Sequence, residues 1–389
     1  MKKEAPDSAI LDIDRLEVNF YTYEGVVQAI DEMSFALQRG DTLGIVGETG
    51  CGKSVTVLAV LGLILPPGRV ESGDITYRPD GAPIVLTGQS DRFLRNIRGN
   101  EISMIFQEAS NALNPVLSIG RQTSESFLLH RQEELCESVL ESIDGRLEGR
   151  KGVAAWYLRL LHSVYRRRLR RAEGNMLKER WYGRRLKRKA VTLSVDLLGS
   201  LGIPNPEEVV KRYPHELSGG MQQRVVIAMA LACNPGILIA DEPTSNLDVT
   251  IQAQILDLIE SLKAKYKSSM LFITHDLGVV SEVADRVAVL YAGTLVEYAA
   301  VRELFRRPLH PYTKALLDSV PKLGKKERLQ SIGGSVPNLL DPPPGCRFHP
   351  RCPEAMEICR KKKPGLYHRD AEDGGTHRVA CFLYREKEA

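Results

Sequence analysis

The stretch GETGCGKS, residues 47–54, decides the fold. It follows the apolar run TLGIVG (42–47), and the helix-like run SVTVLAVLGLIL (54–65) comes after it. A strand, a glycine-rich loop and a helix in this order form the setting in which the pattern G-x-x-x-x-G-K-[ST] makes a phosphate-binding loop. The sequence therefore predicts such a loop, and a glycine-rich turn without a ligand is the structural alternative.

The residue types of this loop suit phosphate. Glycines let successive backbone N–H groups point inward, and the helix that starts at Lys53 adds the positive end of its dipole. We expect the Lys53 ammonium to meet the β and γ phosphates of a nucleotide and the Ser54 hydroxyl to ligate Mg²⁺. The predicted nucleotide-binding residues of the loop are Gly47, Glu48, Thr49, Gly50, Cys51, Gly52, Lys53 and Ser54.

A second phosphate-handling feature is GILIADEPTS, residues 236–245. Four apolar residues predict a buried strand whose carboxyl end carries Asp241, at the sheet edge where α/β proteins bind ligands. Asp241 suits the Mg²⁺ ion, and Glu242 suits the attacking water of a phosphoryl transfer. The alternative is a pair of acids in the first turn of a helix, where Asp and Glu are favoured.

Apolar strands in the second half of the chain alternate with helical stretches. The strands are expected within residues 235–248, 268–278 and 286–299, with a helix at 249–266. Unbroken apolar strands separated by helices predict an α/β fold whose parallel sheet is buried on both faces. With 389 residues the chain exceeds the size of a single core, so more than one domain is expected.

Composition narrows the class of protein. With 43% hydrophobic and 26% charged residues the chain is typical of a globular protein, and its longest apolar run, 54–65, is too short to span a bilayer. The start, MKKEAPDSAILDIDRL, lacks the apolar centre of a signal peptide. We therefore expect the chain in the cytoplasm.

Further motifs resemble those of ATP-binding-cassette ATPases. LSGGMQQR (217–224) resembles the family signature, with Met221 where many members have Gln. Gln107 in IFQEAS resembles the Q-loop, Asp248 in SNLD the D-loop, and His275 in FITHD the switch histidine. With the two phosphate motifs they stand in the family's order over about residues 10–300.

The resemblance implies a fold and cofactors. The expected fold is an α/β P-loop NTPase with a mixed sheet core, a helical subdomain and a small C-terminal Cys-rich extension. The cofactors are ATP and Mg²⁺, with Gln107 joining Ser54 and Asp241 at the metal. It also implies catalysis by Glu242, with His275 on the γ-phosphate.

The resemblance also implies that two such domains meet head to tail. ATP on the phosphate loop of one subunit would then be closed over by the signature loop of the other. The residues expected to face the partner's ATP are Ser218, Gly219, Gly220, Met221 and Gln222, because a hydroxyl and N–H groups at a helix start favour an anion. In each subunit an aromatic ring should stack on adenine, and Tyr23 is chosen over Tyr21.

Three segments resemble the ATPase subunits of oligopeptide, dipeptide and nickel importers: EASNALNPVLSIGRQ (108–122), HPYTKALLDSVP (310–321) and PPPGCRFHPRCPEAMEICRKKKPG (342–365). The resemblance implies an ATP-hydrolysing motor on the cytoplasmic face of the membrane. Its partners would be two integral-membrane permease subunits, a paralogous ATPase subunit or a second copy, and indirectly an extracytoplasmic solute-binding protein. The alternative function is a soluble ABC ATPase acting on ribosomes or nucleic acid. The transported solute, whether peptide, nickel chelate or oligosaccharide, depends on the partners.

We expect a nucleotide-binding domain over residues 1–320 and an extension over 321–389. Within the first, the helical subdomain should cover about 108–235, and a basic insertion about 131–190. Residues 150–190 hold 15 Lys and Arg against 2 Glu, with aromatic and aliphatic residues near helical spacing. Three interpretations stay open, in this order of preference: a solvated helical hairpin, a helix that reaches anionic lipid, and a nucleic-acid contact.

Four of the seven cysteines crowd into the extension: Cys346, Cys352, Cys359 and Cys381. Disulfides are unexpected in the cytoplasm, and four thiolates suit Zn²⁺ or an iron–sulfur cluster. The spacing does not choose between these metals, nor does it exclude a site without metal. The resemblance to peptide importers, whose related subunits are associated with a [4Fe–4S] cluster here, favours the cluster.

Overall fold

The computed structural model describes residues 9–147, 153–172, 183–319, 332–371 and 375–385. Its chain divides into two compact units. The first, here called the sheet unit, comprises residues 1–95, 236–242 and 260–389. The second, the helical unit, comprises residues 96–235 and 243–259. In the described part of the chain, no helix combines the length and the apolar character that a membrane crossing requires.

The main sheet of the sheet unit is mixed, as the sequence predicts. Its central strands run parallel, because β3 pairs in parallel with both β8 and β9, and β7 pairs in parallel with β8. The strand order is β11 (Tyr367–Asp370), β12 (Thr376–Val379), β10 (Thr294–Ala300), β9 (Arg286–Tyr291), β3 (Thr42–Val46), β8 (Ser269–Ile273) and β7 (Ile237–Asp241). Every residue of β3, β7 and β8 is buried, which fits strands covered on both faces.

A second, antiparallel sheet completes the strands of this unit. Its order is β2 (Gly25–Gln38), β1 (Ala9–Thr22), β4 (Gly68–Tyr77) and β5 (Ile84–Val85). The helix α1 (Lys53–Val60) follows β3 directly and packs against β2. It ends five residues earlier than the apolar run 54–65 suggests, since Leu61 caps it. Residues 286–299, expected as strand, form two strands, β9 and β10, joined by a turn at Ala292 and Gly293, which both have positive φ.

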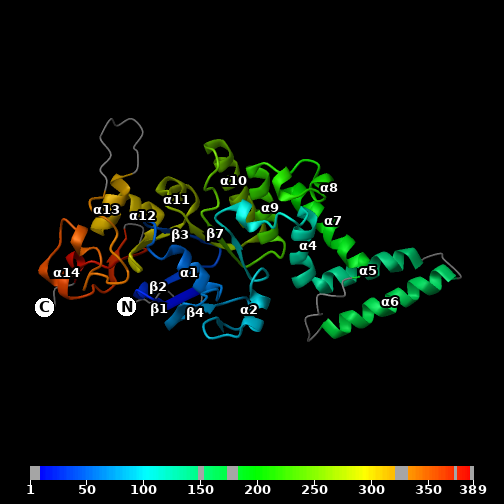
Figure 1. Ribbon diagram of the computed structural model, residues 1–389, viewed down its shortest axis with the longest axis horizontal. Helices are drawn as coiled ribbons and strands as arrows, with labels where there is room; N and C mark the ends of the chain where they lie inside the picture. The colour runs from blue at the N-terminus through cyan, green and yellow to red at the C-terminus, as the bar shows by residue number, and fades with distance from the viewer. Residues whose placement is uncertain (1–8, 148–152, 173–182, 320–331, 372–374, 386–389) are drawn as a thin grey trace. The chain divides into compact units, whose positions relative to one another are not determined.

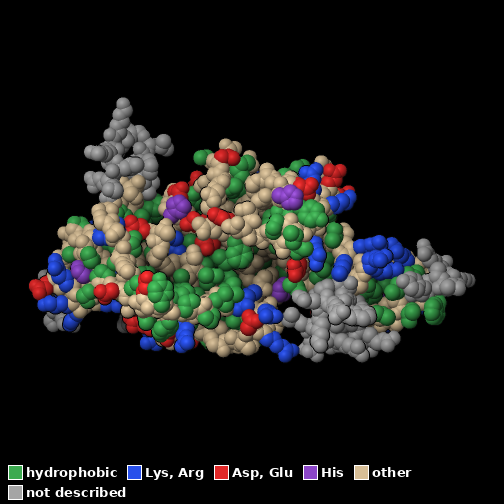
Figure 2. Space-filling view, viewed as in Figure 1, with side chains coloured by type: hydrophobic (Ala, Val, Ile, Leu, Met, Phe, Trp, Pro, Cys, Tyr) green, Lys and Arg blue, Asp and Glu red, His purple; other side chains and the backbone are tan. Residues whose placement is uncertain are grey.

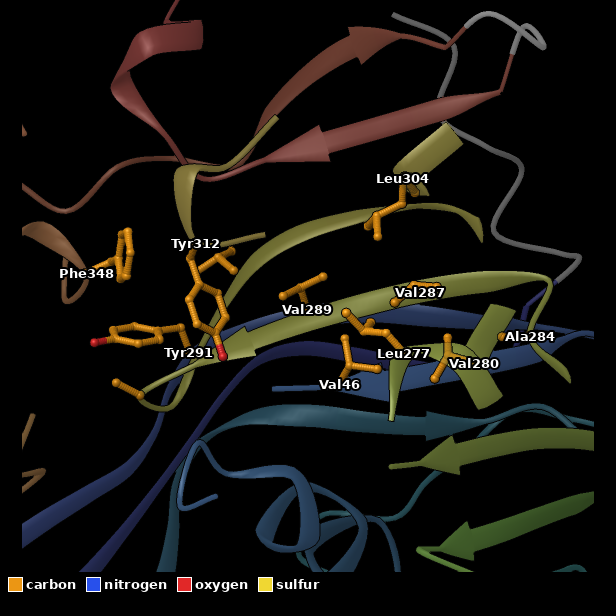
Figure 3. Close-up of a cluster of buried hydrophobic side chains, with 13 residues drawn as sticks. Val46, Leu277, Val280, Ala284, Val287, Val289, Tyr291, Leu304, Tyr312 and Phe348 are labelled. Carbon is orange, nitrogen blue, oxygen red and sulfur yellow. The ribbon is translucent and has the colours of Figure 1, made fainter. Parts of the chain in front are cut away.

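The helices after β8 cover the main sheet with an apolar cluster. They are α11 (Leu277–Val283), α12 (Val301–Arg306) and α13 (Pro311–Asp318). Figure 3 shows the cluster, in which Val46, Val287 and Val289 of the sheet meet Leu277 and Leu304 of the helices. At one end three aromatic rings, those of Tyr291, Tyr312 and Phe348, lie together. Phe348 comes from the C-terminal extension, so the extension shares this core.

The helical unit contains most of the remaining helices. They are α3 (Ala109–Ala112), α4 (Ile119–His130), α5 (Gln132–Leu147), α6 (Val153–Ala172), α7 (Arg184–Ser200), α8 (Pro206–Val209) and α9 (Gly219–Leu231), with the short strand β6 (Ile102–Ile105) and the 3₁₀ turn η2 (Pro214–Glu216). Two helices cross between the units, α2 (Asp91–Ile97) and α10 (Val249–Tyr266).

The basic insertion forms a helical hairpin within this unit. Figure 1 shows α5 and α6 side by side, and the Nε2 of His162 in α6 lies 3.4 Å from the Oδ1 of Asp144 in α5. Leu158 and Tyr165 of α6 are buried in a cluster with apolar side chains of α4, α5 and α7. Trp156, Leu160 and Val164 remain exposed on α6, at four-residue spacing. Residues 173–182 of the insertion lie outside the described residues.

The C-terminal extension adds strands to the main sheet. β12 pairs antiparallel with β10 through Glu297↔Val379 and Tyr298↔Arg378, and β11 pairs with β12. The extension also contains the short helices η3 (His349–Arg351), α14 (Glu357–Lys361) and η4 (Phe382–Tyr384). His377 of β12 is buried against Glu297 of β10, with 2.7 Å between its Nε2 and Oε1. This histidine is therefore a structural partner of a buried carboxylate.

Candidate functional site: a phosphate loop at the carboxyl ends of the central strands

The loop 47–54 joins β3 to α1 and is shaped by its glycines. Gly47 has φ 154°, and a Cβ there would lie 2.2 Å from the carbonyl oxygen of Leu290. Gly52, with φ 101°, stands at the N-cap of α1, where a Cβ would lie 2.9 Å from the carbonyl of Ala29. Side chains at these two positions would strain or push open the loop, so the pattern's glycines are required sterically.

The Lys53 side chain folds back over this loop. Its Nζ donates to the carbonyl oxygens of Gly47 at 2.7 Å and of Glu48 at 3.1 Å. The side chain is buried and the backbone of Lys53 begins α1, so the ammonium and the helix start lie on the same turn. The loop thus presents a fixed positive group beside the start of a helix, and the two together suit an anion.

Asp241 lies beside the loop because of strand register. Asp241 pairs with Ile273 of β8, and Ile273 pairs with Ile45 of β3, two residues before the loop. Burial raises the pKa of the Asp241 carboxyl, while a hydrogen bond from the Ser54 hydroxyl lowers it. Its Oδ1 is buried without a hydrogen-bond partner among the described residues. A buried carboxylate with an open lone pair next to a hydroxyl fits Mg²⁺, which prefers oxygen ligands.

Glu242 and His275 meet at the same sheet edge. The Nδ1 of His275 lies 3.1 Å from Oε1 of Glu242, and 68% of the His275 side chain is exposed. Glu242 has φ 45°, an unfavourable region for a residue with a side chain. Its N–H donates to the carbonyl oxygen of Ile273 at 2.9 Å, which holds this conformation. Strained backbone of this kind concentrates at functional sites.

The signature residues start α9 in the helical unit. The Ser218 side chain caps the helix by accepting from the N–H of Met221 at 3.4 Å. Ser218 and Gly219 are exposed. The Gln222 amide points back to the preceding turn and donates to the carbonyls of Pro214 at 2.9 Å and of Leu217 at 3.2 Å. Gln222 therefore stabilises the signature loop itself.

The remaining predicted residues fall at separate places. Tyr23 is 97% exposed at the turn between β1 and β2, whereas the Tyr21 hydroxyl donates to Glu71 at 2.9 Å. Asp248 accepts from the N–H of Ile251 at 3.0 Å at the start of α10. Gln107 is exposed, and its carbonyl accepts from the Ser245 hydroxyl at 2.8 Å. Gln107 and Asp248 belong to the helical unit, so their roles at the nucleotide stay predictions.

The four cysteines of the extension line one small cavity with about 10 Å³ of free volume, together with His310 and Phe348. All four are free thiols, and burial raises the pKa values of Cys346 and Cys381 to about 11. In the part of the chain that the structure describes, no group of three or more His, Cys, Asp or Glu side chains is arranged to hold a metal ion. The donor set has the right chemistry for a thiolate-bound metal, and the free space between the protein atoms matches about one water.

A contact that sequence reasoning missed joins the extension to the loop. Arg351 forms two hydrogen bonds to the Glu48 carboxylate, with Nη1–Oε2 at 2.7 Å and Nη2–Oε1 at 3.1 Å. The Tyr312 hydroxyl accepts from the Glu48 N–H at 3.0 Å. These partners lie 303 and 264 residues from Glu48, and no local motif signals them.

Comparison with known proteins places these motifs in one family. Residues 30–245 match the family model described as ABC transporter. The chain belongs to the ABC transporter family. Residues 296–359 also match the oligopeptide/dipeptide transporter C-terminal region.

Two Bacillus subtilis (strain 168) proteins show how far the likeness extends along this family member. The oligopeptide transport ATP-binding protein AppD is 41% identical over 98% of this chain and 99% of its own length. The dipeptide transport ATP-binding protein DppD is 42% identical over 97% of this chain and 96% of its own. The likeness therefore includes the extension as well as the cassette.

Solved structures show the same fold for this ABC transporter family member. A dimeric post-hydrolysis state of the ATP-binding cassette MJ0796 bound to ADP and Pi matches with a TM-score of 0.51 and 21% identity, over 75% of this chain and 99% of that one. cbiO1 from Clostridium perfringens matches with a TM-score of 0.51 and 22% identity, over 77% of this chain and 92% of that one. The predicted cassette fold is confirmed, and family membership makes the chain an ATPase.

Proposed function

We propose that this ATPase is the motor subunit of a membrane importer for dipeptides, oligopeptides or a related solute. The observation that carries the proposal is the match of residues 296–359 to the oligopeptide/dipeptide transporter C-terminal region. The relatives AppD and DppD, which align over nearly their full length, are named for oligopeptide and dipeptide transport. The alternative, a soluble ABC ATPase on ribosomes or nucleic acid, has no such match in its favour.

Within the site, this chain's residues would divide the work of hydrolysis. Lys53 and the loop N–H groups would hold the β and γ phosphates, and Asp241 with Ser54 would hold Mg²⁺. The bound metal supplies charge neutralisation on the phosphates. Glu242 would orient the attacking water, and His275, 3.1 Å from it, would position that carboxylate and face the γ-phosphate. The buried open oxygen of Asp241 supports this assignment.

The exposed signature loop supports a head-to-tail dimer with a paralogous subunit or a second copy. Ser218 and Gly219 are exposed at the start of α9, where a hydroxyl and N–H groups can reach an anion on another subunit. Tyr23 would stack on adenine. The Q-loop at Gln107 would transmit the closure of the ATPase dimer to two permease subunits, and a solute-binding protein would act on the extracytoplasmic side of the membrane. The chain would then lie on the cytoplasmic face of the membrane.

Co-purification tests the importer function. A tagged chain with Glu242→Gln, isolated from membranes with mild detergent, should bring two integral-membrane permease subunits. The same complex made with the parent chain and reconstituted in vesicles should take up labelled peptide at the expense of ATP. Capture of ribosomes instead, with ATPase activity stimulated by RNA and no permease subunit, would favour the alternative function.

The helix α6 supports a further contact, with anionic lipid. Trp156, Leu160 and Val164 form an exposed apolar row, and Arg159 and Arg166 are exposed on the same helix. Figure 2 shows hydrophobic side chains at the surface over α6. Rings and aliphatic groups beside arginines suit the headgroup level of a bilayer. Nucleic acid, which the same charge would also attract, is the less favoured partner.

The four cysteines that line the small cavity support a metal site, and thiolate chemistry allows two metals there. Cys346, Cys352, Cys359 and Cys381 would hold a [4Fe–4S] cluster, or Zn²⁺ in its place. Either metal would be structural, since the extension contributes strands to the main sheet.

A further inference from the structure

All three guanidinium nitrogens of Arg351 form hydrogen bonds, and two of them bind the Glu48 carboxylate. Besides the two bonds to the Glu48 carboxylate, Nη1 donates to the Tyr291 hydroxyl at 3.3 Å, Nε to the carbonyl of Gly333 at 2.8 Å, and Nη2 to the carbonyl of Ile332 at 3.4 Å. Its side chain is only 5% exposed. A bidentate Arg–carboxylate pair that is shielded from water is both strong and geometrically specific.

The aromatic end of the apolar cluster supports this pair. Tyr291 and Tyr312 have ring centroids 4.7 Å apart, and the Phe348 ring lies 5.0 Å from Tyr291 and 5.4 Å from Tyr312. Figure 3 shows the three rings together. Since Phe348 stands three residues before Arg351, the same turn of the extension delivers the ring and the guanidinium. The pair therefore stands on a rigid base.

Glu48 is held at three points. Its carboxylate accepts from Arg351, its N–H donates to the Tyr312 hydroxyl, and its carbonyl accepts from Lys53 Nζ at 3.1 Å. Because the Glu48 N–H is already engaged, this residue shapes the loop from behind and leaves phosphate contact to the others. Contacts thus run from Arg351 of the extension through Glu48 to the Lys53 ammonium, the group proposed above to hold the phosphates.

We propose that Arg351 is a positioning residue for ATP, which acts through Glu48 to hold the phosphate loop in its binding conformation. The inference rests on the proposed role of the loop. A preformed loop avoids the cost of ordering when nucleotide binds, so the contact favours affinity. The hydrogen-bond partners of Arg351 are Glu48, Tyr291, Gly333 and Ile332, so its role is assigned to ATP binding and not to the hydrolysis step at saturating ATP. The C-terminal extension is thereby part of the nucleotide site.

Steady-state kinetics and direct binding of a fluorescent ATP analogue to the full chain test this. Arg351→Met and Glu48→Gln should each raise the KM and the Kd for ATP about tenfold, with kcat within about twofold of the parent. Arg351→Lys keeps the charge but loses the bidentate geometry, so its KM and Kd for ATP should lie between those of the parent and those of Arg351→Met. The double variant should bind ATP no more weakly than the more severely affected single variant, because both changes remove the same contact.

Two reference variants make the result decisive. Lys363→Met removes ion pairs of 2.7 Å from the extension to Asp31 and Glu32 without touching the loop, and should leave the KM unchanged. Lys53→Ala should abolish binding, and if it does not, the proposed site itself is wrong. If Lys53→Ala loses ATP but Arg351→Met binds it normally, or if Lys363→Met weakens ATP equally, the positioning role is overturned while the site stands. If Arg351→Met does not fold, the KM and Kd for ATP of Glu48→Gln and Arg351→Lys decide the same question.

Discussion

The Glu242 carboxylate and the His275 imidazole lie 3.1 Å apart at the carboxyl ends of β7 and β8. The two residues are 33 positions apart in the chain, and parallel strand pairing brings them together. The first prediction follows from this pair. Glu242→Gln keeps the shape of the side chain but cannot accept a proton from water, so hydrolysis should fall by about a hundredfold or more while ATP stays bound.

Stopped hydrolysis should also trap a closed dimer. Size-exclusion chromatography with ATP should show Glu242→Gln as a dimer, and the parent as a monomer once turnover is complete. Lys53→Ala, which lacks the ammonium over the loop, should stay monomeric under the same conditions. Wild-type turnover by Glu242→Gln would refute the assignment of this carboxylate.

The second prediction concerns acid stability. Burial lowers the pKa of His310 to about 4 from an ordinary 6.5, and its Nδ1 accepts from the N–H of Tyr312 at 3.0 Å, which requires the unprotonated nitrogen. Between pH 6.5 and about 4, the His310 imidazole is protonated in the unfolded chain and unprotonated in the folded chain. The free energy of unfolding should therefore decrease by up to about 3 kcal/mol as the pH falls through this window.

Replacing His310 should flatten that dependence. His310→Asn keeps a side-chain acceptor for the helix start but has no group that titrates there. Urea unfolding at several pH values should show a smaller loss for this variant between pH 6.5 and about 4 than for the parent. The exposed His215, changed to Gln, is the control and should keep the parent slope. Equal slopes for the parent and for His310→Asn would contradict the prediction.

The third prediction concerns the cysteine cavity. Protein purified without oxygen should be brown and contain about four irons per chain, and Cys352→Ser should lose both the colour and the iron. Cys136→Ala, in α5 and outside the cavity, is the matched control. Stoichiometric zinc in colourless protein would instead identify a structural zinc site, and the absence of both metals would contradict the metal site and leave four free thiols.

The fourth prediction concerns α6. Changing Trp156, Leu160 and Val164 together to Ser should reduce flotation of the ATPase with anionic liposomes several-fold, because it removes the apolar row that would enter the headgroup layer. Arg159→Gln with Arg166→Gln should reduce it as well, since each cation near an anionic surface contributes about 1 kcal/mol. The exposed Leu65, changed to Ser, is the control. Flotation that none of these changes reduces would exclude α6 as the lipid contact.

Local sequence was sufficient for the chemistry of the phosphate loop. Gly47, Gly52 and Lys53 are read directly, because the loop's shape depends on which backbone angles its own residues tolerate. The strand before Asp241 is likewise evident from its apolar run. Parallel pairing through β8 then sets Asp241 level with Ile45 of β3, one strand away. Motif order then indicated the family.

Only the tertiary structure decided what surrounds that loop. The sequence predicts an extension over residues 321–389. In the fold, β12 of this extension joins the main sheet, and Arg351 forms hydrogen bonds with Glu48, 303 residues away in the chain. The fold also buries His377 of β12 against Glu297 of β10, 80 residues away in the chain. Local patterns encode backbone conformation and burial, while a contact between distant side chains depends on which elements pack together, and no short stretch of sequence carries that information.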